Sequence, residues 1–239
     1  MAKQYLHLFQ SSQNETNYSN SPQYEEPYLA AVESTREAYY NKFIQQGIKR
    51  VEYLRNSGNA YIDTGIKMHK YYGMGCTFKA ITYGSNASQW KIFCGCRTAF
   101  NYSLNWNWQA HSVLFDYLGG GTLSVNPSYN VNNIITAETR PDVTNKKMYA
   151  YCDGVQKSSY AMPASDAVQS VNYWIFSAYN EYRNQQTNIY HFWITNQYNE
   201  KILNLLPVKI DDVGYMYDTI NNRIFSKSGD GTFIIGPEL

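Results

Sequence analysis

The C-terminal stretch from Thr187 to Leu239 constrains the fold most, because its pattern predicts one β-hairpin directly after another. Apolar and polar residues alternate on both sides of a turn-rich break at 196–200, as expected for two antiparallel strands joined by a tight turn. A second strand pair flanks the turn at 219–222, and Asp230-Gly231 then leads into an apolar run at 232–235. We therefore expect the end of the chain to be a strand of the fold and not a loose tail.

Short strand patterns continue back along the chain to Val51. Turn signals rich in Gly, Asn and Ser separate them, and no helical period lies between them. Asp153-Gly154 is the strongest hairpin signal, and Gly119-Gly120-Gly121 marks a break. Strands are predicted at 51–54, 60–64, 73–82, 90–97, 102–108, 113–118, 133–138, 147–152, 156–159 and 173–178. Many short strands with no helix between them predict an all-β fold of antiparallel sheets packed as a sandwich.

Residues 1–48 differ from the rest, and we expect an extended, partly helical anchoring arm before a β domain at 49–239. Residues 10–27 are polar and cannot bury enough apolar surface to fold alone. Residues 28–46 have helical spacing with Gly47 as a stop, and the alternative is short strands that add to another chain's sheet. A neighbouring subunit is expected to hold this arm. The predicted assembly contacts are Tyr5, Leu6, Leu8, Phe9, Tyr24 and Tyr28.

Composition limits the partners of this chain. With 44% hydrophobic residues among 239, the chain has enough apolar material for a large core. Its 20 Lys and Arg nearly balance its 19 Asp and Glu, and no basic cluster is present, so no nucleic-acid partner is expected. No apolar run reaches the length of a signal peptide or a membrane span. The sequence predicts a soluble chain that is made in the cytoplasm and does not bind membranes.

The four cysteines are predicted to be reduced, buried side chains. Cys94 and Cys96 are separated by one residue, which is shorter than the usual zinc spacing, and no second ligand pair lies nearby. Cys76 and Cys152 each stand alone in a predicted strand, where a free cysteine behaves as a small apolar residue. The cysteines therefore predict neither a metal site nor a disulfide.

Calcium is the remaining metal to consider, through Asp63, Asp116 or Asp153 together with loop carbonyl groups. No calcium-ligand string surrounds any of the three, and the turn chemistry of Asp-Gly explains Asp153. We therefore predict no metal and no cofactor.

Both ends of the predicted β domain carry a family resemblance. The opening contains VEYL at 51–54 and NAYIDTGI at 59–66, and the close contains LPV at 206–208, VGYMYD at 213–218 and GDGTF at 229–233. These motifs resemble the concanavalin A-like (laminin-G type) jelly-roll domains of gut-bacterial surface proteins and of structural proteins of their tailed phages, and the CDG turn at 152–154 also fits. The resemblance covers roughly residues 49–239. It implies a two-sheet antiparallel jelly roll of lectin type, with Val208, Tyr215, Tyr217 and Phe233 expected inside the sandwich. The arm resembles the leaders of virion structural proteins in such phages.

Catalysis is not expected. Glycan-cleaving members of this fold use two carboxylates on one strand, and the Glu-x-Asp-x-x-Glu spacing is absent. Acids stand singly or adjacent, as at Asp211-Asp212, where neighbouring side chains of an extended segment face apart. No histidine has a Ser or Cys at motif spacing. We therefore predict a protein that is not an enzyme.

The run at 101–108 is the first candidate glycan site. Its amides alternate with aromatic rings, including Trp106 and Trp108, and sugars use ring faces for stacking and amides for their hydroxyl groups. In the alternative, the aromatic residues and Leu104 share one face of a strand and build the core. Ser103, Asn105 and Asn107 then face outward. The sequence alone leaves both interpretations open.

The run at 179–184 is the second candidate glycan site, with Tyr179, Tyr182 and Arg183 as its binding residues. It has the composition of a loop, and loops at the ends of a sandwich often carry recognition. The alternative is a solvated turn with aromatic caps.

Two functions fit these observations. The first is a phage virion structural protein that displays a lectin-like domain toward host or mucosal glycans. A capsid-attached decoration protein or a head fibre is favoured over a tail protein. It would be located in the virion in several copies or as a homo-oligomer, attached to other virion proteins through its arm. The alternative is a free-standing carbohydrate-binding module or lectin of a bacterial surface protein. A polar arm in place of a signal peptide favours the virion protein.

Overall fold

A computed structural model describes residues 47–81, 90–98, 101–107, 111–117, 121–164, 166, 168–179 and 186–239. Within these residues all regular structure is β-strand, and the fold is a two-sheet jelly-roll sandwich, as predicted. The predicted arm lies outside this part of the chain up to Gln46, so its helix and its assembly residues stay predictions, as does the domain boundary at 48/49.

The larger sheet contains eleven of the strands formed by the described residues. They are β1 (Ile48–Arg50), β2 (Leu54–Gly58), β4 (Gly73–Ala80), β9 (Ile135–Asp142), β10 (Lys147–Cys152), β11 (Val155–Ala161), β14 (Thr187–Thr195), β15 (Lys201–Ile210), β16 (Val213–Asp218), β17 (Arg223–Phe225) and β18 (Gly231–Ile235). The strand order is β11-β10-β9-β4-β14-β15-β16-β17, with β1 beside β15 and β2 joining β14 to β18.

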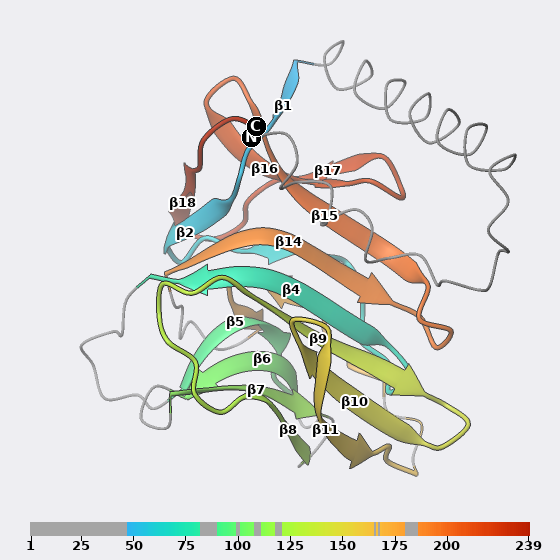
Figure 1. Cartoon of the computed structure of the whole chain (residues 1–239). Coiled ribbons are helices and arrows are strands. Elements are labelled where there is room, and N and C mark those ends of the chain that lie inside the picture. Colours follow the sequence, from blue (N-terminus) through green and yellow to red (C-terminus); the bar gives the residue numbers. More distant parts are fainter. Residues whose placement is uncertain are drawn as a thin grey trace, which may run out of the picture. The chain divides into compact units, whose positions relative to one another are not determined.

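The smaller sheet contains the other seven strands of the described chain. They are β3 (Ile62–Asp63), β5 (Trp90–Cys96), β6 (Tyr102–Asn107), β7 (Ser112–Tyr117), β8 (Gly121–Asn126), β12 (Trp174–Ile175) and β13 (Ala178–Tyr179). The order is β3-β12-β5-β6-β7-β8, and all neighbours are antiparallel except β13, which runs parallel to β5. Figure 1 shows β5 to β8 as one layer and β14, β4, β9 and β10 as the other.

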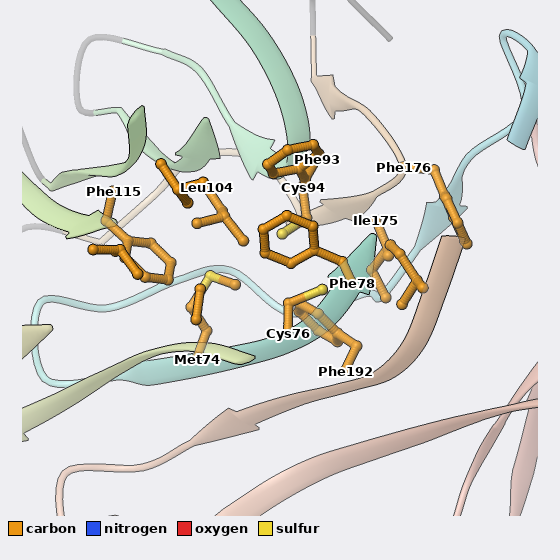
Figure 2. Packing of buried hydrophobic residues seen from close by; sticks show 14 of the residues in the cluster. Met74, Cys76, Phe78, Phe93, Cys94, Leu104, Phe115, Ile175, Phe176 and Phe192 are labelled. Atoms are coloured by element: carbon orange, nitrogen blue, oxygen red, sulfur yellow. The ribbon is translucent and has the colours of Figure 1, made fainter. Parts of the chain in front are cut away.

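The core lies between the two sheets because alternate residues of each strand face inward. Along β9 every second residue is buried, beginning with Ile135 and Ala137, and the residues between them are only partly buried. Figure 2 shows how inward side chains of both sheets meet, with Phe78 and Phe192 from the larger sheet opposite Phe93 from the smaller one. The Phe78 and Phe93 ring centroids are 4.3 Å apart. Burial of these faces is the main source of stability in such a sandwich.

The C-terminal hairpins are confirmed. β14 and β15 pair across the turn at 196–200, β16 and β17 pair across the turn at 219–222, and β18 pairs with β2. Asp218 is fully buried and holds the second turn, since its carboxylate accepts hydrogen bonds from the backbone N–H groups of Asn204 and Ile220. The Asp153-Gly154 hairpin is also confirmed, with the positive φ angles of 50° and 77° that such a turn requires.

Several details differ from the sequence prediction. No strand was predicted at β8 (Gly121–Asn126), and only Leu54 of the predicted strand at 51–54 belongs to a strand. Residues 55–59 were expected to form a loop because they are polar, but most of them belong to β2. Asn56 tolerates burial there, because its side chain donates to the carbonyl of Phe176 and accepts the N–H of Thr187. Tyr215 was expected inside the sandwich, but the core residue of β16 is Met216 and Tyr215 faces the other way.

Among the other residues expected inside the sandwich, Val208 and Tyr217 are buried but lie outside the core cluster, on the same sheet face as Tyr215. Phe233 is partly buried against the core. The four cysteines are free and buried, as predicted. No helix in the described part of the chain is long and apolar enough to cross a membrane.

Phe192 tests the core. We expect Phe192→Ala to lower the free energy of unfolding by about 3–5 kcal/mol, because it removes a fully buried ring and leaves a cavity between the sheets. Val155→Ala is the control, since Val155 is 57% exposed on an edge strand and its truncation should change stability by less than about 0.5 kcal/mol. Urea denaturation measures both, and equal midpoints for the two variants would contradict this core.

Candidate functional site

One row of residues crosses the outer face of the smaller sheet. Asp116 of β7 lies opposite Ser103 of β6, Ser103 lies opposite Gly95 of β5, and Gly95 lies opposite Trp174 of β12. Directly opposed residues of antiparallel strands share one face. The chain neighbours of all four residues belong to the core cluster, so the row itself faces away from the core. The row continues to Asp63 of β3 beyond Trp174.

Polar side chains gather at the β6–β7 end of this row. The Asn105 amide nitrogen donates hydrogen bonds to Asp116 Oδ2 at 2.7 Å and to Ser103 Oγ at 3.0 Å. The Arg97 guanidinium lies 3.9 Å from Asp116 Oδ2, and both charged side chains are about one-fifth exposed, at 22% and 20%. The Asn105 amide oxygen is buried and has no hydrogen-bond partner among the residues that the structure describes. We refer to Arg97, Ser103, Asn105 and Asp116 as the polar cluster.

An aromatic pair lies at the other end of the row. The rings of Tyr61 and Trp174 are stacked, with centroids 3.8 Å apart and planes 16° apart. Trp174 is 7% exposed, and Tyr61 is partly exposed beside it. Trp174 is therefore buried, and Tyr61 is the ring of the pair that keeps an exposed surface for an apolar contact.

Gly95 lies where β5 and β6 approach each other closely, in the middle of the row. A Cβ atom built on Gly95 would lie 2.4 Å from the Cβ of Ser103, so the β5–β6 pair has no space for a side chain at this position. The glycine is required by this close approach of two strands. Gly95 and Ser103, which lie between the aromatic pair and Asp116, are both buried.

The described acids of this face are too far apart to cleave a glycosidic bond together. Asp116 and Asp63 lie on strands separated by four strand spacings, or about 19 Å at ~4.8 Å per spacing. Glycoside hydrolases hold their two carboxylates roughly 5–10 Å apart. This row has groups suited to hydrogen bonding and stacking, but these two acids cannot act on the same bond.

Sequence reasoning placed its first glycan site on the neighbouring residues of β6. Trp106 is fully buried in the core cluster, which favours the core interpretation and removes it from the candidate site. Ser103 and Asn105 face outward from the same strand. Trp108 lies outside the described residues.

The second predicted glycan site begins at the edge of the same sheet. Tyr179 belongs to β13, and its backbone pairs with Cys96 of β5. Arg97 follows Cys96 directly in the sequence. Tyr182 and Arg183 lie outside the described residues, so their roles stay predictions. Sequence reasoning did not find Arg97, Tyr61 or Trp174, because they come from segments far apart in the sequence and no local motif connects them.

The three aspartates considered for calcium lie apart from one another. Asp63 accepts hydrogen bonds from the Gly65 N–H and the Asn172 amide, and Asp153 accepts the Thr136 N–H. Asp116 belongs to the polar cluster. In the described part of the chain no group of three His, Cys, Asp or Glu side chains could hold a metal ion.

Cys96 lies directly beneath the row, on the core side of β5. Burial raises the pKa of its thiol to about 12, so the group is protonated at neutral pH. A protonated thiol is a poor nucleophile and a poor metal ligand. Cys96 is a packing residue under the site.

The outer face of the larger sheet has a second aromatic and polar group. His191 Nε2 lies 2.8 Å from Asn204 Oδ1, and its ring lies 4.6 Å from that of Trp193. Lys201 Nζ lies 5.0 Å from the Trp193 ring centroid. Burial lowers the pKa of His191 to about 3, so its ring is neutral at pH 7. The polar cluster differs from this group in its unpartnered Asn105 amide oxygen, and we therefore place the candidate site on the smaller sheet.

Sequence comparison finds no matching protein-family model and no matching curated protein. Structure comparison finds similar folds. A protein from Bacteroides ovatus, described as a candidate carbohydrate-binding protein, aligns with a TM-score of 0.56 at 10% identity. The alignment covers 80% of this chain and 62% of that protein, so this chain spans less than two thirds of its length. This likeness shows the shared β-sandwich fold.

Two further structures are more distant. A heptameric SAP-like pentraxin from Limulus polyphemus aligns with a TM-score of 0.45 at 8% identity, covering 79% of this chain and 94% of that one. The CBM40 of the Ruminococcus gnavus IT-sialidase aligns with a TM-score of 0.44 at 10% identity, covering 61% of this chain and 89% of that one.

Gly95 tests the geometry of the row. Gly95→Ala should destabilise the domain by about 1–3 kcal/mol, because the new methyl group must push Ser103 and the β6 backbone away. Thr122→Ala is the control, since Thr122 is exposed in the same row and its truncation should be nearly neutral. Thermal unfolding followed by circular dichroism measures the difference, and an unchanged midpoint for Gly95→Ala would contradict the close β5–β6 approach.

Proposed function

We propose that residues 49–239 form a lectin-like carbohydrate-binding domain without catalytic activity, whose ligand binds on the outer face of the smaller sheet. The observation that carries this proposal is the polar cluster in one row with the Tyr61–Trp174 pair. Sugars present hydroxyl groups around the ring edge and C–H groups on the ring face. Recognition therefore combines polar hydrogen-bonding side chains with an aromatic surface.

The polar cluster supplies both hydrogen-bond acceptors and donors. The Asp116 carboxylate accepts hydrogen bonds strongly because it is charged, and the Arg97 guanidinium donates. The Asn105 amide oxygen is a buried acceptor with no partner in the described structure, and a ligand hydroxyl group would relieve the cost of leaving it unpaired. The cluster is thus suited to a ligand rich in hydroxyl groups.

The absence of catalysis is part of the proposal. The wide separation of Asp116 and Asp63 supports it, because a glycosidase needs two acids on either side of one bond. The Bacteroides ovatus neighbour also supports a binding role, since it is described by carbohydrate binding and not by a reaction.

We further propose that the protein is a structural component of a phage virion, present in several copies or as a homo-oligomer. In this proposal residues 1–48 attach it to other virion proteins, as a capsid decoration or head fibre, and the jelly roll faces outward toward host or mucosal glycans. The resemblance of the arm and of the β-domain motifs to virion structural proteins supports this role.

A carbohydrate-binding module or lectin of a bacterial surface protein is the second candidate. It is supported by the structural neighbour from Bacteroides ovatus, a bacterial protein of the same fold. Both candidates share the proposed ligand face and differ in what the arm does.

Asp116 tests the ligand face. We expect the wild-type chain to bind on a glycan array and Asp116→Asn to bind about tenfold more weakly, because the amide replaces a charged acceptor at nearly constant volume. Tyr198→Ala should bind normally, because Tyr198 is 71% exposed at the β14–β15 turn, away from the smaller sheet. Matching affinities of Asp116→Asn and wild type, with both proteins folded, would exclude this face.

Chymotrypsin digestion tests the arm. The enzyme cleaves after large aromatic residues, and the arm contains Tyr5, Phe9, Tyr24 and Tyr28. The isolated chain should be cut within residues 1–48, because a polar arm without a partner does not fold, and the same sites should be protected in assembled particles. Mass spectrometry of the fragments reads out both states. Resistance of the arm in the isolated chain would argue against an assembly anchor.

A further inference from the structure

Residues near the end of the sequence hold the first strand of the domain in place. β1 pairs with the end of β15 along one edge. Along the other edge, three backbone hydrogen bonds join residues 50–53 to residues 236–239, and Val51 and Glu238 form an antiparallel bridge. The N–H groups of Leu239 and Gly236 donate to the carbonyl groups of Arg50 and Tyr53, and the N–H group of Glu52 donates to that of Pro237. We call residues 236–239 the C-terminal segment, and Figure 1 shows the C-terminus beside β1.

The register of β1 and β15 places two lysines opposite each other. Lys49 pairs with Lys209, and directly opposed residues of an antiparallel pair share one face. Two like charges in this position destabilise the pairing. The Glu238 carboxylate contacts both, at 2.6 Å from the Lys209 Nζ and 3.3 Å from the Lys49 Nζ. The C-terminal segment therefore supplies the negative charge that offsets the two lysines.

Glu238 is better placed for this role than the neighbouring acid. Asp212 lies 3.9 Å from the Lys209 Nζ, and its side chain is fully exposed, so water and salt screen its charge. The Glu238 side chain is about half exposed and that of Lys209 is 18% exposed. The contact between Glu238 and Lys209 is therefore both shorter and less screened.

Glu238 makes this contact sensitive to pH. Its hydrogen bond from Lys209, followed by that from Lys49, holds the pKa of the carboxyl group below its ordinary value. A carboxyl group with a lowered pKa stabilises the folded arrangement at neutral pH, and this contribution is lost as pH falls through that pKa. Acid therefore removes the negative charge and leaves Lys49 and Lys209 opposed.

β1 and the C-terminal segment can leave the sheet without loss of the core. None of residues 48–50 and 236–239 belongs to the core cluster, although Ile48 is buried, whereas Val51 and Leu54 do belong to it. Short segments with few core contacts open locally, at a lower free energy than global unfolding. We therefore expect such an opening to stop at Val51, where the core cluster begins.

We infer that the C-terminal segment is an acid-sensitive clasp, with Glu238 as its central contact, that fixes β1 to the larger sheet and opens while the sandwich stays folded. Gly47 directly precedes β1, so opening adds residues 47–50 to the linker between residues 1–46 and the sandwich. At ~3.3 Å per residue, these residues lengthen the linker by about 13 Å. This consequence for attachment rests on the proposed role of residues 1–48, whereas the clasp itself does not.

Hydrogen–deuterium exchange of the full chain, read by mass spectrometry of peptic fragments, tests the clasp at neutral pH. In Glu238→Gln, the amides of residues 48–53 and 236–239 should exchange about tenfold faster than in the wild type, because the two lysines are left opposed. The amides of β4 and β14 should keep their wild-type rates, because these strands lie in the middle of the sheet and contribute to the core cluster.

A second substitution separates charge from packing. Adding Lys49→Gln to Glu238→Gln removes one of the two opposed charges and should return the exchange of residues 48–53 to within about threefold of the wild type. Asp212→Asn is the matched control, since it removes an exposed charge near Lys209 and should change the rate by less than about twofold. In acid, after correction for intrinsic exchange, the wild type should approach the rate of Glu238→Gln.

The outcomes decide between a clasp and a passive end of the chain. Wild-type exchange rates in Glu238→Gln, or a double variant that stays as fast as Glu238→Gln, would overturn the charge-based clasp. Equal acceleration in β1 and β14 would overturn local opening, because the whole domain would then unfold together. None of these results bears on glycan binding, so the clasp and the proposed function are tested independently.

Discussion

The burial of one face of each sheet against the other is the constraint on which the rest of the domain depends. A core of aromatic, aliphatic and sulfur-containing side chains fills the space between the two layers (Figure 2). Since successive side chains of a strand point to opposite faces, the residues that enter this core also determine which residues face outward. Tyr102, Leu104 and Trp106 enter the core from β6, and Ser103 and Asn105 consequently form part of the outer surface.

The candidate site is a direct consequence of this alternation. In β5, β6, β7 and β12, the outward residue of the row lies between two residues of the core cluster. The sheet register then brings together side chains that are far apart in sequence, such as Ser103 and Trp174, which flank Gly95 on neighbouring strands. The rigid sheet holds these groups at fixed spacings.

Local sequence patterns predicted most of the strands because turn chemistry and alternation act over short distances. Asp153-Gly154 and the turn at 196–200 are where they were predicted, and the C-terminal run is strand β18. The prediction failed where a distant contact outweighed local preference. The polar segment at 55–59 resembles a loop, but Asn56 obtains its hydrogen-bond partners from Phe176 and Thr187, which are more than a hundred residues away.

The sequence by itself determined the all-β class, the hairpins and the two possible faces of the 101–108 run, because these depend on residues within a few positions of one another. Only the tertiary structure decided that Trp106 belongs to the core and that Asp116, Asn105 and Arg97 form one cluster. That decision depends on strand order and register, which arise from the packing of the whole sandwich. No single segment of the sequence specifies strand order and register, so the row can be recognised only in the folded domain.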